Sequence, residues 1–281
     1  MEEILAKEIL AAENLNKTFG EGTKAVHAVR GADIRVNKGE RLFIHGPSGA
    51  GKSTLLHVLA GLDRPTSGSV SFRGEDIYSL SDRKRSALRN RSFGFIFQFY
   101  HLLPELSILE NVMLPAMIKG DEKRGDIVDR AVYLLESVGL GKRLKHRPSR
   151  LSGGEAQRAA IARALINPTD VLFCDEPTGN LDSKMSEDIY NIIRETSEDR
   201  GMSVVVVSHQ TVISNFPHTE YVMKDGILKK TPVTGMKDKH SLTRKEPKKE
   251  KQIEKPEERR SDRKMRISEG KKEIKWDLRF F

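Results

Sequence analysis

The sequence predicts an α/β fold with a mostly parallel core sheet, and three segments carry this prediction. Residues 41–45, 171–174 and 203–209 are short apolar runs, typical of parallel strands that are covered on both faces. The first runs through a glycine-rich turn into the helical sequence LLHVLAGL, the second ends in two acids, and the third ends in a histidine. Because ligands of open α/β sheets bind at the carboxyl ends of the strands, these polar residues indicate a functional site.

The turn GPSGAGKST after the first strand fills every position of a P-loop. Its glycines let the backbone fold tightly around phosphate, and successive N–H groups together with the helix N-terminus attract the anion. We expect nucleotide contacts from Gly46, Pro47, Ser48, Gly49, Ala50, Gly51, Lys52, Ser53 and Thr54. Lys52 is expected to reach the β- and γ-phosphates, Ser53 to bind Mg²⁺, and Thr54 to contact another phosphate oxygen. Taken alone, this motif predicts a nucleoside triphosphatase.

The second apolar run, in DVLFCDEP, ends in two acids that are expected to face the ligand. Asp175 is expected to hold Mg²⁺, directly or through water. Glu176 is the candidate general base that polarises the attacking water. His209 ends the third run and is a candidate for contacting the γ-phosphate and this water. The only cysteine, Cys174, lies in the apolar run and is expected to be a small core residue.

A second anion cradle, LSGGE at 151–155, opens the helical sequence AQRAAIARAL. LSGGE upstream of the DE pair resembles the signature motif of ABC ATPases. In that family two ATPase domains pack head to tail, and each ATP lies between the P-loop of one domain and the signature motif of the other. The resemblance implies a homodimer in which Ser152, Gly153 and Gly154 bind the γ-phosphate of the partner's ATP.

Further segments are similar to other elements of the same family. Gln98 matches the Q-loop, which senses Mg²⁺ and water and meets the membrane subunit, so it is both a catalytic and a metal-binding candidate. The sequence GNLD at 179–182 matches the D-loop, which crosses the dimer interface. Phe19 stands where the family places an aromatic ring against adenine; tyrosine is usual there, and phenylalanine can still stack. The implied cofactors are ATP and Mg²⁺.

The resemblance implies a P-loop NTPase fold of the ABC type over residues 1–230. Residues up to about 40, with about 69–75, are expected to form an antiparallel β layer, and an inserted, mostly helical subdomain is expected over about 85–165. Residues 229–281 hold 19 Lys+Arg and 10 Asp+Glu, so the whole formal net charge of +9 lies at this end of the chain. With three prolines and few large apolar residues, the tail at 231–281 is expected to be disordered.

The sequence contains neither a signal-peptide pattern nor an apolar run of the roughly 20 residues needed to cross a bilayer. We therefore expect a peripheral protein on the cytoplasmic face of the inner membrane, acting through integral membrane permease subunits. The basic tail is interpreted either as a solvated extension or as a segment that attracts anionic lipid. Because the body is neutral, nucleic acid is not the expected partner.

The segment FQFYHLLPELSILENVMLPAMIKG at 97–120 is informative about the subfamily. It resembles the lipoprotein-releasing ATPases and their relatives in macrolide-type exporters, and its Q-loop region implies the surface that docks on a permease. The resemblance therefore implies an ATPase that powers lipoprotein release from the inner membrane or related export. Two alternatives stay open: a cell-division ATPase that signals through a membrane partner, and a soluble ABC protein that acts on ribosomes or DNA.

Overall fold

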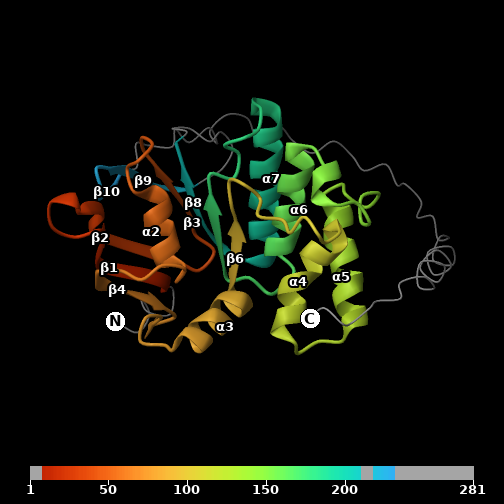
Figure 1. Cartoon of the computed structure of the whole chain (residues 1–281), viewed down its shortest axis with the longest axis horizontal. Helices are drawn as coiled ribbons and strands as arrows, with labels where there is room; N and C mark the ends of the chain where they lie inside the picture. The colour runs from red at the N-terminus through yellow and green to blue at the C-terminus, as the bar shows by residue number, and fades with distance from the viewer. Residues whose placement is uncertain (1–7, 210–217, 232–281) are drawn as a thin grey trace, which may run out of the picture. The chain divides into compact units, whose positions relative to one another are not determined.

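A computed structural model describes residues 8–209 and 218–231 of the chain, all within one compact unit. Two sheets and the helices packed on them make up this unit (Figure 1). The tail at 231–281, for which the sequence predicts disorder, lies outside the described residues except at Thr231. None of the described helices is long and apolar enough to span a bilayer.

The core sheet has six strands in the order β10-β9-β3-β8-β7-β6. The central strands are parallel, and only the last pair, β9 with β10, is antiparallel. The bounds are β3 Arg41–His45, β6 Phe93–Ile96, β7 Val171–Asp175, β8 Ser203–Ser208, β9 Thr219–Lys224 and β10 Ile227–Lys230. The three strands that the sequence predicts are therefore confirmed as β3, β7 and β8, and they lie next to one another.

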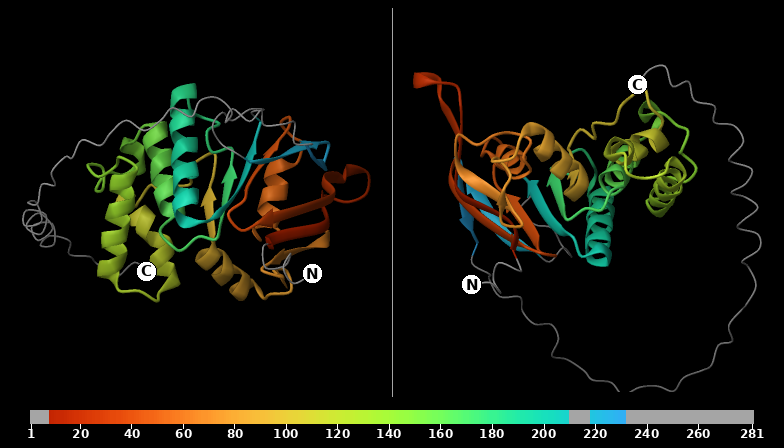
Figure 2. Two further views of the ribbon diagram at one scale, coloured as in Figure 1. Left: turned by 180° about the vertical axis from the view of Figure 1, so that it is seen from behind. Right: turned by 90° about the horizontal axis from the view of Figure 1, so that it is seen from below.

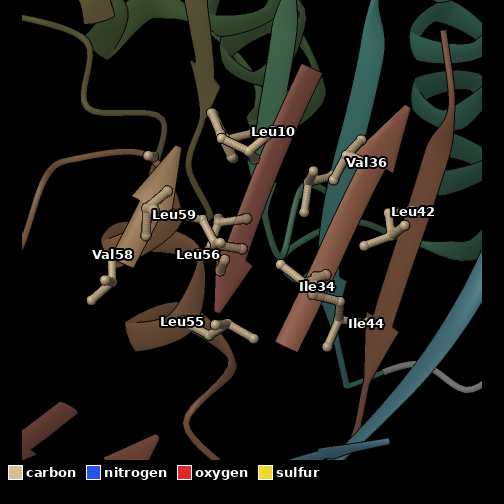
Figure 3. Close-up of a cluster of buried hydrophobic side chains, with 14 of the residues drawn as sticks. Leu10, Ile34, Val36, Leu42, Ile44, Leu55, Leu56, Val58 and Leu59 are labelled. Carbon is tan, nitrogen blue, oxygen red and sulfur yellow. The ribbon is translucent and has the colours of Figure 1, made fainter. Parts of the chain in front are cut away.

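A second sheet, of order β2-β1-β4-β5, is antiparallel throughout and confirms the predicted β layer. Its strands are β1 Glu8–Phe19, β2 Val26–Asn37, β4 Ser67–Phe72 and β5 Glu75–Asp76, with a 3-10 turn at Gly22–Lys24 between the first two. Helix α2, Lys52–Leu59, packs between the two sheets. Figure 3 shows its leucines facing Leu10, Ile34 and Ile44 in one apolar core.

On the other side of the core sheet, helices pack with the sheet and with one another around a second apolar core (Figure 2). These are α4 Ile108–Lys119, α5 Arg124–Ser137, α6 Gly153–Ala164 and α7 Ser183–Arg200; α3, Asp82–Ser92, precedes β6, and a 3-10 turn at Pro148–Arg150 precedes α6. Alternate residues of β8 point into the two cores, with Val204 and Val206 on the helical side and Val205 and Val207 on the α2 side. The two-sided burial explains why this strand reads as a continuous valine run.

The sequence range 85–165, predicted to be mostly helical, contains α4, α5, α6 and most of α3. It also contains β6, which pairs in parallel with β7 and so belongs to the core sheet. The helical insertion thus leaves the sheet after Ile96 and returns to it at Val171. Cys174 is fully buried in the helical-side core, as predicted.

Candidate functional site

The loop between β3 and α2 forms one wall of a cavity of about 610 Å³. Gly51 has φ 101°, and a side chain there would overlap the carbonyl oxygen of Ala28 on β2, so only glycine fits. The loop is also fixed to the β9–β10 turn, because Gly226 donates its N–H to the Ala50 carbonyl at 3.1 Å. The cavity lining includes Phe19, Arg30, Gly49, Gly51, Lys52, Ser53, Thr54, Asp225 and Gly226.

Two chemically different ends face this cavity. The ring of Phe19 is 44% exposed, with the ammonium of Lys17 4.7 Å from its centroid. An exposed ring can stack on a planar heterocycle. At the other end lie the backbone N–H groups of the loop and the N-terminus of α2, which suit phosphate. The arrangement fits a nucleotide with its base at Phe19 and its phosphates at Lys52.

Lys52 is buried and bends back over its own loop. Its ammonium donates to the carbonyl oxygens of Gly46 and Pro47, at 2.9 and 3.0 Å, and lies 4.0 Å from Oε1 of Glu176. The ammonium thereby stands in the middle of the loop, where a phosphate would exchange for these carbonyls. Neither Pro47 nor Ser48 lines the cavity with its side chain, whereas Ala50 is buried beneath the loop.

Ser53 and Asp175 meet where α2 begins and β7 ends. The Ser53 hydroxyl donates to Oδ1 of Asp175 at 2.8 Å, and Nε2 of His57 lies 3.4 Å from the other carboxylate oxygen. A hydroxyl and a carboxylate are hard oxygen ligands of the kind that Mg²⁺ prefers. No cluster of three or more His, Cys, Asp or Glu side chains suited to a metal occurs in residues 8–209 and 218–231. A metal here would depend on oxygens from a nucleotide or water as well.

Glu176 and His209 face each other from the ends of two adjacent strands. β7 and β8 are paired in register, and Nδ1 of His209 lies 2.6 Å from Oε2 of Glu176. Glu176 has φ 48°, a left-handed conformation that costs a non-glycine residue energy. Its backbone N–H donates to the Val207 carbonyl at 2.9 Å, which fixes this geometry. The strained turn projects the carboxylate toward Lys52 rather than into solvent.

Gln98 lies in the segment after β6 and contacts the loop after Glu176. The side-chain amide of Asn180 donates to the Gln98 carbonyl at 3.0 Å, and a Cβ on Gly179 would stand 3.1 Å from Nε2 of Gln98. Arg163 on α6 donates to the carbonyls of Tyr100 and His101 and so holds the same segment from the helical side. The segment is therefore held from both sides of the molecule.

The signature motif begins α6 with a capping box. The Ser152 hydroxyl accepts from the Glu155 N–H at 3.2 Å, and the Glu155 carboxylate accepts from the Ser152 N–H at 2.9 Å. This backbone hydrogen bond, outweighing burial, lowers the pKa of Glu155, and the Arg143 guanidinium at 3.0 Å lowers it further. None of the signature residues lines the 610 Å³ cavity. The two cradles of one chain therefore do not share a site.

The two signature glycines are set by close packing. A Cβ on Gly153 would stand 3.0 Å from the Tyr100 hydroxyl, and one on Gly154 would stand 2.8 Å from Sδ of Met185. Their backbone N–H groups open α6 without side chains to cover them, which suits an anion from outside the chain.

Sequence reasoning missed several residues of this neighbourhood. Arg30 and Asp225 line the cavity, His57 faces Asp175, and Asn180 and Arg163 fix the Gln98 segment. These residues lie far from the motifs that they contact, except His57 and Asn180. The sequence did contain a signal for those two residues. His57 lies one helical turn after Ser53, and Asn180 is a polar residue inside GNLD.

Such a site, with a P-loop, a paired Ser53 and Asp175, and a Glu176–His209 pair, defines an ATP-hydrolysing P-loop enzyme. Residues 29–179 match the family model described as ABC transporter. The chain belongs to the ABC transporter family of ATP-binding subunits, and it is an ATPase.

Relatives with established names include the lipoprotein-releasing system ATP-binding protein LolD of Shewanella frigidimarina. It is 47% identical over 226 residues, covering 80% of this chain and 94% of that protein. The protein of the same name from Geobacter metallireducens is 46% identical over 218 residues, covering 78% of this chain and 96% of the relative.

Solved structures agree with the fold. A dimeric bacterial ABC transporter cassette, MJ0796, superimposes with a TM-score of 0.73 at 36% identity, covering 79% of this chain and 98% of that one. A post-hydrolysis dimer of the same cassette, bound to ADP and phosphate, gives the same values.

Proposed function

We propose that this chain is the ATPase subunit that powers a permease for lipoprotein release from the inner membrane. One observation carries the proposal: the chain has a nucleotide cavity, and it also has a capped signature helix that does not line this cavity. The similarity to LolD proteins over nearly their whole length supports the choice of cargo. Two copies, packed head to tail, place the signature helix of each against the nucleotide of the other.

Within one composite site, different residues bind the base, the phosphates and the metal ion. Phe19 stacks on adenine, the P-loop backbone and Thr54 bind the phosphates, and Lys52 exchanges its two carbonyls for phosphate oxygens. Ser53, Asp175 and Gln98 would hold Mg²⁺, which would neutralise phosphate charge. The hydrogen bond between Ser53 and Asp175 supports this assignment, because it brings together two oxygens that one cation could bind.

Hydrolysis depends on the pair at the strand ends. Glu176 accepts a proton from the attacking water, and His209 orients the Glu176 carboxylate and contacts the γ-phosphate. Ser152, Gly153 and Gly154 of the second copy complete the cradle. Once the γ-phosphate has left, the contact between the nucleotide and Ser152 of the second copy is lost, and the dimer opens. ATP thereby shifts an open–closed equilibrium through contacts that it makes only in the closed state.

The permease docks beside the Q-loop. A cleft of about 430 Å³ lies there, lined mainly by apolar side chains of α4, β6 and the 97–101 segment, among them Phe95, Phe97, Pro115 and Ile118. Ile118 is 69% exposed. An apolar cleft that includes exposed side chains indicates a protein-binding surface. Because Phe97 lines the cleft and is adjacent to Gln98, a permease bound in the cleft can shift Gln98 and so affect the nucleotide site.

Docking on a permease places the chain on the cytoplasmic face of the inner membrane. There the basic segment 231–281 attracts anionic lipid, with each cation near the surface contributing about 1 kcal/mol. Deletion of residues 231–281 should weaken binding of the chain to vesicles that contain phosphatidylglycerol. Unchanged binding would remove the lipid role of the tail without touching the ATPase assignment.

The test of the proposed function is a pull-down from membranes with tagged Glu176→Gln protein, ATP and Mg²⁺. We expect a permease with a large periplasmic domain, together with bound lipoprotein. An Ile118→Asp change in the same background should lose the permease but keep ATP binding, whereas Tyr133→Asp, at an equally exposed apolar position on α5 outside the cleft, should keep both. Recovery of ribosomes or nucleic acid without a membrane protein would overturn the proposal.

A further inference from the structure

A basic hollow of about 700 Å³ lies in the segment that joins α5 to α6. Its walls are Arg143, Lys145, His146, Arg147, Ser149 and Arg150. Lys145, Arg147 and Arg150 are exposed, and none of them has an ion-pair partner within residues 8–209 and 218–231. The wall contains no acidic side chain. Three uncompensated cations around one hollow suit an anionic ligand.

The hollow is rigidly attached to the signature motif. Arg143, on its wall, pairs with Glu155 at 3.0 Å, and Glu155 in turn caps the Ser152 N–H at 2.9 Å. From the other side, the N–H of Ile108 at the start of α4 donates to the His146 carbonyl at 2.8 Å. The segment that carries the cations is therefore tied to the N-terminus of α6, where Ser152 lies.

The nucleotide cavity of the same chain is poor in positive charge. Its charged lining consists of Arg30, Lys52 and Asp225, so it holds one net positive charge. The carboxylates of Asp175 and Glu176, next to Ser53 and Lys52, add negative charge near the γ-phosphate position. A triphosphate in this cavity therefore carries more negative charge than these side chains offset.

We infer that the basic hollow is an anion site for the nucleotide held by a second copy of this chain. This inference rests on the proposed head-to-tail dimer. Ser152 meets the γ-phosphate, and Lys145, Arg147 and Arg150 extend the contact beyond it and offset the remaining negative charge of the partner's nucleotide. Such cations stabilise the closed dimer without contributing to nucleotide binding by the separate chain.

The experiment measures ATP-driven dimer formation of the full-length Glu176→Gln parent by sedimentation velocity, over a range of ATP concentrations with Mg²⁺ and at several salt concentrations. The test variant adds Lys145→Gln, Arg147→Gln and Arg150→Gln. The matched control adds Arg83→Gln, Lys84→Gln and Arg91→Gln, which removes three exposed α3 cations, also without ion pairs in the described part of the chain. Binding of a fluorescent ATP analogue to the dilute, monomeric protein is measured alongside.

For the hollow variant we expect the ATP concentration at half-maximal dimerisation to rise about tenfold and its salt dependence to flatten, with nucleotide binding to the monomer unchanged. The α3 control should behave like the parent. If the parent dimerises and the hollow variant matches it at all salt concentrations, the inference is wrong and the proposed function stands. The inference is also wrong if the hollow variant dimerises like the parent but binds anionic vesicles or RNA more weakly than the parent does. That outcome would favour lipid or nucleic acid as the ligand of the hollow. If the parent itself fails to dimerise with ATP, the head-to-tail proposal and this inference fail together.

Discussion

Replacing Glu176 by glutamine separates binding from hydrolysis at the composite site. Glutamine keeps the length and shape of the side chain but cannot accept the proton of the attacking water. A general base contributes about 10²–10⁴-fold to the rate, which corresponds to about 3 to 5 kcal/mol of the activation barrier. We expect kcat for ATP hydrolysis to fall by that factor, with no rise in the KM for ATP.

The stability of this variant should change little. The left-handed backbone at φ 48° is equally strained for glutamate and glutamine, so this cost cancels. Glutamine can still accept from His209, which is about half exposed, so the lost charge contributes no more than about 1 kcal/mol. Loss of activity therefore cannot be attributed to unfolding. The 4.0 Å separation between Lys52 and Glu176 further predicts that Lys52 is freer to bind phosphate once the carboxylate is neutral.

Steady-state phosphate release, nucleotide affinity and chemical denaturation are measured on the same preparation. A folded Glu176→Gln protein that binds ATP and retains hydrolysis within tenfold of the parent would refute the role of Glu176 as general base. Glu176→Asp is the companion variant, because it keeps the charge but withdraws it by one methylene from His209. It should be similarly slow if geometry, and not charge alone, sets the rate.

Three further changes probe the adenine end, the signature cap and the Q-loop support. Phe19→Ala should weaken ATP binding by about 1 kcal/mol, roughly fivefold in Kd by titration, while Phe19→Tyr should leave it unchanged. The folded state lowers the pKa of Glu155 from 4.5, so the carboxylate stabilises the helix cap fully above that pH and loses this effect as the pH falls through the folded-state pKa. Glu155→Gln should therefore lower Tm at pH 7, and the difference in Tm between the parent and the variant should shrink in acid. Asn111 is fully buried and bonds Leu103 through both its amide atoms, so Asn111→Ala should cost about 2 to 3 kcal/mol in urea unfolding.

The strands that carry the site could be predicted because each is buried on both faces and reads as an uninterrupted apolar run. β6, with the sequence FGFI, is four residues long and follows the highly charged α3, so local pattern gives it no clear signal. It enters the sheet through pairing with β7, a contact between segments far apart in the sequence. The β9–β10 hairpin was missed for a similar reason, since its second strand is short and mostly exposed.

The same distinction applies to the site. Lys52, Ser53, Asp175 and Glu176 lie within motifs whose spacing reflects a fixed strand–turn–helix geometry. Arg163, by contrast, reaches carbonyls of the 100–101 segment from a helix more than 60 residues away in sequence. A single arginine in a helical pattern is most simply read as a surface residue, and nothing local reveals its partners. Such supporting contacts follow from the tertiary fold rather than from periodicity.

The two half-sites of the proposed dimer differ in how many hydrogen bonds must break before they can bind phosphate. Lys52 must give up two carbonyl partners before it can bind phosphate, and these bonds offset part of the gain. Ser152 uses its hydroxyl oxygen as an acceptor for the helix cap, so its O–H remains free to donate to a phosphate without breaking the capping box. Closing the dimer on a bound ATP therefore adds a contact with little reorganisation. ADP lacks the γ-phosphate and gives Ser152 no partner, so the nucleotide state alone biases the chain between separate and paired copies.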